Sequence, residues 1–264
     1  MPKRLPIALT IAGSDSGGLA GLQADLKTFA AFGVHGLSAI TAITAQNSMK
    51  VRAVHVLRAG VLLDQLEALC ADFDIAAVKV GMLGNTANVR VVADWLRRQQ
   101  PRSVVLDPVL ISTSGSRLLS ARALSVLRDE LLPLSSLVTP NLPEAEALLG
   151  RRLDGADRLH DIAAEMQRMG ARATLLKGGH ADGTTTVRDI YVDARGSLEF
   201  EHLRLPYTAR GTGCTLASAI TAGLARNPSL RSAVRQAESY LQTCYARAAP
   251  IGRGGMRALI QNPA

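Results

Sequence analysis

A short segment near residue 213 combines glycines, hydroxyl side chains and a thiol in the order Gly211-Thr212-Gly213-Cys214-Thr215. It opens a run of small and apolar residues that predicts a long helix over residues 212–225. The first N–H groups of a helix have no partner within it and attract anions, so we expect an anion hole for developing negative charge. Cys214 would lie in the first turn, where the helix dipole lowers the pKa of a thiol. A structural turn with a buried cysteine is the alternative interpretation.

A second glycine-rich segment runs from Gly13 to Gly21, between the first predicted strand and the first predicted helix. Glycines at the carboxyl end of a strand let a ligand approach the backbone, and the following helix offers free N–H groups. No Gly-Lys-Ser/Thr follows, which excludes a Walker A loop, and the spacing differs from that of a dinucleotide-binding fingerprint. We therefore expect a ligand-binding loop, with an ordinary strand-to-helix turn as the alternative.

Carboxylate and amide side chains follow two other predicted strands. Asn141 and Glu144 are three positions apart at the start of a predicted helix, so they share one face. Such a pair can hold Mg²⁺ through water, although a helix N-cap with its capping-box partner has the same pattern. Asp107, which ends a strand before Pro108, is a second candidate for organising metal or phosphate.

Polar residues also stand beside apolar runs nearer the N-terminus. Asp25 lies on the first predicted helix, and Gln46-Asn47 ends the second long strand. An amide offers both donors and acceptors, which suits the edge of an aminopyrimidine or pyridine ring. Capping or turn formation is the alternative interpretation for each of these residues.

The elements that must position these residues alternate along the chain. Short apolar runs followed by stretches of helical period predict an α/β fold with a mainly parallel sheet and crossover helices. We expect a single domain over residues 1–264, since one large sheet commonly occupies this length. The turn residues 193–196 join extended runs at 184–192 and 197–203 and predict a small antiparallel hairpin. The other expected strands are 7–11, 37–43, 77–80, 103–106, 137–139 and 173–177, and the expected helices are 19–31, 60–71, 86–98, 121–131, 143–149, 156–169, 212–225 and 230–246.

Composition narrows the class of partner. The 264-residue chain has a formal net charge of +8, yet its basic residues form no long stripe and aromatic residues make up only 3%. We expect no nucleic-acid binding, because few rings are present on which bases could stack. Three cysteines without close spacing fit neither a disulfide framework nor a cysteine zinc site, and we expect no signal peptide and no membrane span. These features predict a cytoplasmic protein.

Taken together, the motifs resemble the hydroxymethylpyrimidine/phosphomethylpyrimidine kinase family of the ribokinase-like superfamily. The resemblance runs in order from about Ala8 to Gly223. Beyond the two glycine-rich segments, it rests on Gln23-Ala24-Asp25-Leu26-Lys27-Thr28, Thr44-Ala45-Gln46-Asn47, Gly81-Met82-Leu83, Leu106-Asp107-Pro108-Val109, Thr139-Pro140-Asn141-Leu142-Pro143-Glu144 and Leu176-Lys177-Gly178-Gly179-His180.

This resemblance implies a three-layer α/β/α fold, an ATP-dependent phosphotransferase and a homodimer. The γ-phosphate of ATP would pass to 4-amino-5-hydroxymethyl-2-methylpyrimidine and then to its monophosphate, in the biosynthesis of thiamine diphosphate. Both steps would share one site. The resemblance places Gly13, Asp25, Gln46 and Met82 in its pyrimidine pocket, and it makes Asp107, Asn141 and Glu144 organisers of phosphate and Mg²⁺, with Asp107 and Glu144 as metal ligands.

The resemblance also implies roles where the phosphate is transferred. Lys177 would neutralise the transferring phosphate, while Gly179 and Thr212 would help Lys177, Asn141 and Asp107 to bind ATP. Gly211, Gly213 and Cys214 would form the anion hole, and Cys214 stands where sugar kinases of the superfamily place an aspartate general base. A thiol suffices there if phosphoryl transfer depends on positioning and charge neutralisation.

Some positions depart from the family pattern. Leu19 and Lys50 stand where glycine is usual, and Arg210 stands where histidine commonly precedes Gly-Thr-Gly-Cys. Arg210 could add a phosphate ligand or remain solvated. Two other functions stay open: a pyridoxine or pyridoxal kinase, whose hydroxymethylpyridine substrate has a similar shape, and a non-catalytic sensor of pyrimidine or nucleotide.

Overall fold

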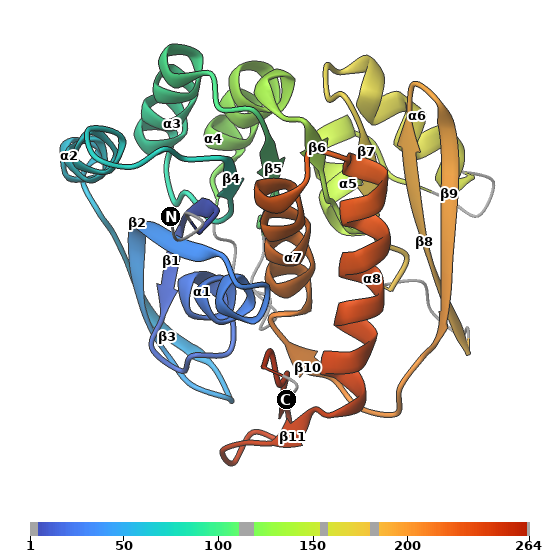
Figure 1. The fold of residues 1–264 in the computed structure, drawn as a ribbon. Coiled ribbons are helices and arrows are strands. Elements are labelled where there is room, and N and C mark those ends of the chain that lie inside the picture. Colours follow the sequence, from blue (N-terminus) through green and yellow to red (C-terminus); the bar gives the residue numbers. More distant parts are fainter. Residues whose placement is uncertain (1–4, 111–118, 154–157, 180–184, 263–264) are drawn as a thin grey trace.

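The computed structural model describes residues 5–110, 119–153, 158–179 and 185–262, and a nine-stranded sheet forms its centre (Figure 1). The strand order is β3-β2-β1-β4-β5-β6-β7-β8-β9, in which β1, β2 and β4 to β7 are parallel and β3, β8 and β9 join by antiparallel pairing. Three short strands form a second sheet, in the order β10-β12-β11. The strands are β1 Ile7–Asp15, β2 His35–Gln46, β3 Val51–Val56, β4 Ala77–Val80, β5 Val104–Leu106, β6 Leu137–Val138, β7 Thr174–Leu176, β8 Thr186–Asp193, β9 Gly196–Leu203, β10 Ala209–Arg210, β11 Ala249–Pro250 and β12 Arg257–Ala258.

Helices cover both faces of the large sheet. On one face α1, α7 and α8 pack together, with α7 and α8 side by side (Figure 1), while α2 to α6 cover the other. This arrangement confirms the predicted three-layer α/β/α fold. None of the helices in the described ranges is long and apolar enough to cross a bilayer. They are α1 Gly21–Ala31, α2 Ala59–Cys70, α3 Thr86–Gln99, α4 Ala121–Val126 with the π-helical turn Leu127–Leu131 and the 3₁₀ turn Leu132–Leu134, α5 Leu142–Leu149, α6 Leu159–Arg168, α7 Thr212–Arg226 and α8 Leu230–Ala246.

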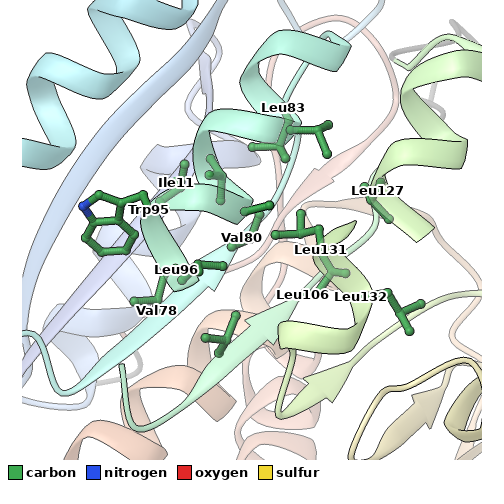
Figure 2. Close-up of a cluster of buried hydrophobic side chains, with 14 of the residues drawn as sticks. Ile11, Val78, Val80, Leu83, Trp95, Leu96, Leu106, Leu127, Leu131 and Leu132 are labelled. Atoms are coloured by element: carbon green, nitrogen blue, oxygen red, sulfur yellow. The ribbon is translucent and has the colours of Figure 1, made fainter. Parts of the chain in front are cut away.

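A buried cluster fixes the central strands against the helices that follow them. Figure 2 shows Val78 and Val80 of β4 facing Leu96 of α3, with Leu131 beside them. Trp95 is also buried in this cluster. Burial of an aliphatic or aromatic side chain of this size contributes about 1.5–3 kcal/mol relative to exposure. The carboxyl ends of β1, β4 and β5 are therefore held at fixed positions relative to one another.

The expected strands and helices are present, with shifted ends, and the predicted hairpin is confirmed as β8 and β9. The short strands β10 to β12 were not predicted, and neither was β3. Most of its residues are exposed, so its sequence lacks the apolar run of a central strand, and only pairing with β2 defines it. Four positions of the expected features lie outside the described residues: 156 and 157 of the helix 156–169, 180 of the motif that ends at His180, and 184 of the hairpin.

Candidate active site

A cavity of about 800 Å³ lies at the carboxyl ends of the parallel strands and extends to α7 and α8. Ligands bind at this edge in open α/β sheets because the loops after successive strands meet there. Of the residues predicted to form a site, Gly13, Gln46, Met82, Asp107, Asn141, Glu144, Lys177, Gly179, Gly211, Thr212, Gly213 and Cys214 line it.

Asp25 is the exception, because it does not line the cavity as expected but is fully buried. Its two carboxylate oxygens accept hydrogen bonds from the Lys79 ammonium at 2.9 and 3.1 Å. The hydroxyls of Thr10 and Ser218 also donate to it, at 2.6 and 2.7 Å. Burial opposes the charge of Lys79, but the neighbouring groups, Asp25 first and Asp107 among them, together outweigh burial and raise the pKa of the ammonium. Lys79 lines the cavity, so Asp25 orients an ammonium that a ligand can reach.

The N-terminus of α7 faces the cavity through Thr212, Gly213 and Cys214. No side chain in the described ranges caps this helix, so its first N–H groups are available to a ligand. Gly211 precedes the helix with a φ of 79°, and a Cβ there would collide with the Leu19 carbonyl oxygen. Both the backbone angle and the close approach therefore require glycine at this position.

A cation and two carboxylates meet beside this helix terminus. The Lys177 ammonium lies 3.2 Å from Asp107 Oδ1 and 3.9 Å from Glu144 Oε2. A Cβ on Gly213 would lie 3.1 Å from Lys177 Nζ, which places the ammonium against the first turn of α7. Burial opposes the charge of Lys177, but Asp107 and Glu144 outweigh it and raise the pKa of the ammonium. A positive charge and free N–H groups are thus directed at one volume of the cavity.

Glu144 has the capping role that was its alternative interpretation. Its Oε2 accepts the Asn141 N–H at 2.9 Å, and Asn141 Oδ1 accepts the Glu144 N–H at 2.9 Å, so the two residues form a capping box. Burial raises the pKa of the Glu144 carboxyl to about 7, while Lys177 acts in the opposite direction. Carboxylate oxygens accept more than one hydrogen bond or metal contact, so capping leaves capacity for a cation. The oxygen donors of Asp107, Asn141 and Glu144 fit water-mediated binding of Mg²⁺.

The thiol of Cys214 contradicts the expectation drawn from its position. Burial raises its pKa to about 11, although Lys79 and the Gly21 N–H group act in the opposite direction. The cost of burying a thiolate is therefore larger than the stabilisation that Lys79 and this N–H group give it. At neutral pH the side chain is a protonated thiol and has little capacity to act as a base.

The loop between β1 and α1 is organised by its own side chains. The Asp15 carboxylate accepts the N–H groups of Gly17, Leu19 and Ala20 at 2.7, 3.1 and 2.9 Å. The Asp15 N–H in turn donates to Gln23 Oε1 at 2.8 Å. The helix was expected to begin at Leu19 and to offer free N–H groups there, but the Asp15 carboxylate already occupies those of Leu19 and Ala20.

Arg210 is buried, so it is not the solvated arginine considered above. Its guanidinium donates to Gln46 Oε1 at 3.1 Å and to the Asn47 carbonyl at 2.8 Å. Arg210 therefore holds the end of β2 next to the segment before α7 and orients the Gln46 amide. Asn47 has the turn role of its alternative interpretation, because its Oδ1 accepts the N–H groups of Met49 and Lys50.

Sequence reasoning missed Lys79 and the polar residues contributed by β8, β9 and α8. Lys79 interrupts a strand that is otherwise apolar and buried, and a lysine in such a strand indicates an internal partner. Asp189, His202 and Gln242 also line the cavity. They belong to no recognisable motif, so only the folded chain reveals their proximity.

The chain is similar to known proteins over nearly its whole length. Residues 15–258 match the model of a family described as phosphomethylpyrimidine kinase. A hydroxymethylpyrimidine/phosphomethylpyrimidine kinase of Rhizobium meliloti is 46% identical over 252 residues, which cover 94% of either chain. The thiamine biosynthesis bifunctional protein ThiED of Geobacter sulfurreducens is 42% identical over 247 residues, and the match covers 93% of this chain but only 50% of that protein.

Two solved structures share this architecture. The ADP complex of Bacillus subtilis pyridoxal kinase superposes with a TM-score of 0.88 at 30% identity, covering 97% of both chains. The phosphomethylpyrimidine kinase of Clostridium difficile superposes with a TM-score of 0.80 at 39% identity, covering 90% of this chain and 98% of that one.

Proposed function

Because this chain belongs to the phosphomethylpyrimidine kinase family and has the ribokinase-like fold, we propose that it transfers the γ-phosphate of ATP to 4-amino-5-hydroxymethyl-2-methylpyrimidine. The monophosphate is then phosphorylated in the same cavity, as a step toward thiamine diphosphate. Relatives named as hydroxymethylpyrimidine/phosphomethylpyrimidine kinases support this reading, as do solved pyridoxal kinases in complex with ADP or AMP-PCP.

The observation that carries the proposal is the meeting of Lys177 with the uncapped N-terminus of α7 at Gly213. Three equatorial oxygens share the charge of a transferring phosphoryl group, and fixed positive groups stabilise them. Lys177 and the N–H groups from Gly211 to Cys214 are positive groups of this kind, held in fixed positions. Gly179, Asn141 and Thr212 complete the ATP-binding wall of the same cavity.

Mg²⁺ is part of the proposal, with Asp107 and Glu144 holding it through water and Asn141 beside them. When bound, the ion would neutralise phosphate charge. Lys177 already lies against both carboxylates, so the chain keeps opposite charges paired in this corner of the cavity.

The substrate end of the cavity is formed by Gly13, Gln46 and Met82. Arg210 occupies the Gln46 oxygen, which leaves the amide N–H groups as donors for a ring nitrogen. Asp25 contributes to the substrate end of the cavity indirectly, by holding the Lys79 ammonium in place. We propose that Cys214 positions the acceptor as a neutral thiol, and the second acceptor is already an anionic phosphate that needs no strong base.

Phosphorylation of pyridoxal is the second candidate function. It is favoured by the similarity to the pyridoxal kinase of Staphylococcus aureus, whose complex with pyridoxal superposes with a TM-score of 0.89 at 30% identity. A ring with a hydroxymethyl group would enter the same cavity in either case.

A competition experiment separates these functions. Purified protein receives ATP and an equimolar mixture of the hydroxymethylpyrimidine and pyridoxal, with Mg²⁺ or with EDTA, and mass spectrometry identifies the products. We expect one and then two phosphoryl groups on the pyrimidine with Mg²⁺, and loss of both products with EDTA or in Lys177→Met. Exclusive phosphorylation of pyridoxal would contradict the proposal, and binding without any product would favour a sensor.

The remaining features of the proposal concern the whole protein. It comprises one domain over residues 1–264, acts in the cytoplasm and forms a homodimer without nucleic-acid or membrane partners. A cavity that holds Lys177, Glu144 and Cys214 together supports a catalyst rather than a sensor, since ligand binding alone does not need phosphoryl-transfer groups.

A further inference from the structure

Three titratable side chains meet where the β8–β9 hairpin packs on α8. Asp189, His202 and Glu238 each place one potential ligand atom within 4.8 Å of the others. Asp189 and His202 are diagonal neighbours on one face of the hairpin, since the strand register pairs Asp189 with Phe200. Glu238 comes from α8, which covers that face.

Within the described residues, no hydrogen bond offsets the burial of Glu238. The residue is 5% exposed, and neither carboxylate oxygen has a hydrogen-bond partner within the part of the chain that the structure describes. Asp189 is also buried, and its Oδ1 accepts the Gly178 N–H at 2.7 Å. Burial and the Asp189 carboxylate raise the pKa of Glu238 to about 8. Two adjacent buried carboxylates are strongly unfavourable unless a cation or a proton lies between them.

We propose that Asp189, His202 and Glu238 bind a divalent transition-metal cation of the zinc class. The observed separations leave a point about 2.8 Å or less from all three donor atoms, and small side-chain rotations would reach the bond lengths of about 2.0–2.2 Å that zinc requires. One imidazole with two carboxylates favours Zn²⁺, Co²⁺ or Mn²⁺, because Mg²⁺ and Ca²⁺ select oxygen donors. Gln242, one helical turn after Glu238, lies on the same face of α8 and lines the cavity.

A cation at this site ties the hairpin to α8 and, through Asp189, fixes Gly178 next to Lys177. It therefore stabilises one wall of the cavity. Lys177 lowers the pKa of both carboxyls and so opposes a second cation, which limits the affinity of the site. The site shares no residue with the proposed magnesium ligands, and the inference does not rest on the identity of the substrate.

Cobalt tests the inference directly, because Co²⁺ replaces Zn²⁺ and its visible absorption changes when protein ligands replace water. The EDTA-stripped, full-length protein is titrated with Co²⁺ in excess Mg²⁺ without nucleotide, and the absorption and melting temperature are recorded. We expect one equivalent to bind, to raise the melting temperature and to be displaced by Zn²⁺. Glu238→Gln and His202→Ala should each weaken binding at least tenfold.

Two control variants locate the bound ion. Glu201→Gln removes a carboxylate from an exposed position next to His202, and Glu144→Gln removes one from the proposed magnesium site, so both should bind Co²⁺ like the parent chain. Metal-free Glu238→Gln should melt no lower than the parent, since a carboxyl with a pKa of about 8 is mostly protonated at neutral pH and the amide replaces a neutral group of nearly the same size. If Glu238→Gln fails to fold, the Co²⁺ affinity of His202→Ala alone tests the inference. The inference is overturned if no Co²⁺ binds, or if neither Glu238→Gln nor His202→Ala weakens binding. A thiolate-to-cobalt charge-transfer band would overturn it as well, because it would place the ion on a cysteine.

Discussion

The thiol of Cys214 lies in the first turn of α7, a position that by itself lowers a thiol pKa. Burial has the opposite effect, and the pKa of this thiol is raised to about 11. The proton therefore stays on sulfur at neutral pH. Charge stabilisation in this corner of the cavity comes from Lys177 and from the backbone N–H groups of the helix.

Alkylation of Cys214 measures this pKa. Because the thiolate is the reactive species, its iodoacetamide modification rate should rise about tenfold per pH unit from pH 7 to 10 without reaching a plateau. Mass spectrometry of peptides from partly modified protein gives the rate at each cysteine, and Cys214→Ser confirms the peptide assignment. A plateau between pH 8 and 9 would show that the helix dipole dominates after all.

Residues at the ends of strands were predictable, and their long-range partners were not. Asp107, Asn141 and Lys177 each follow a buried strand, and parallel strands bring such positions to one edge of a sheet. Arg210 and Gln46 are 164 positions apart, and nothing in their local sequence indicates that they form a hydrogen bond. The capping of Glu144 and its proposed metal binding have the same sequence pattern, so the sequence left both open.

At the scale of elements, one buried ion pair connects the sheet with two helices on the same face. Lys79 projects from β4 to Asp25 on α1, and Ser218 on α7 donates a hydrogen bond to the same carboxylate at 2.7 Å. Both charged side chains are fully buried. This pair therefore fixes the positions of α1 and α7, whose N-termini carry the two glycine-rich segments.

Loss of one partner should be far more harmful than loss of both charges. Lys79→Met leaves the Asp25 carboxylate buried without its cation, and we expect the free energy of unfolding to fall by about 3–5 kcal/mol. In Lys79→Met/Asp25→Asn the amide oxygen still accepts from Thr10 and Ser218, so part of that loss should be recovered. Urea denaturation of the parent and the three variants of this cycle gives the coupling energy. Additive losses in the double variant would contradict the interpretation.

Apolar periodicity predicted the parallel strands and the covering helices because each must bury a face. β3 escaped prediction because edge strands need bury little: its residues are mostly exposed, and its backbone bonds to β2 supply the stabilisation. The π-helical turn Leu127–Leu131 also lacks a local signature, since its residues continue the apolar pattern of α4.

For the whole molecule, the outer end of the large sheet carries apolar side chains that solvent reaches. β3 is the last strand at this end, so one side of its backbone has no neighbouring strand within the described sheet. Ile43 on β2, Met49 in the turn after β2 and Val54 on β3 are 48%, 56% and 37% exposed. An exposed edge strand with apolar side chains is prone to pair with another chain unless it is covered. The proposed homodimer would cover it with a second copy.

We therefore expect a dimer that dissociates when this edge becomes charged. Sedimentation velocity over a range of concentrations should show a dimer for the parent chain, and Met49→Lys/Val54→Lys should weaken association at least tenfold, because lysine on an edge strand disfavours pairing with another chain. Leu5→Lys is the matched control, since Leu5 is apolar and 63% exposed but lies outside this edge, and it should leave the assembly unchanged. A monomeric parent would contradict the proposed assembly, whereas a dimer unaffected by the double substitution would retain the dimer but place its interface on another face of the molecule.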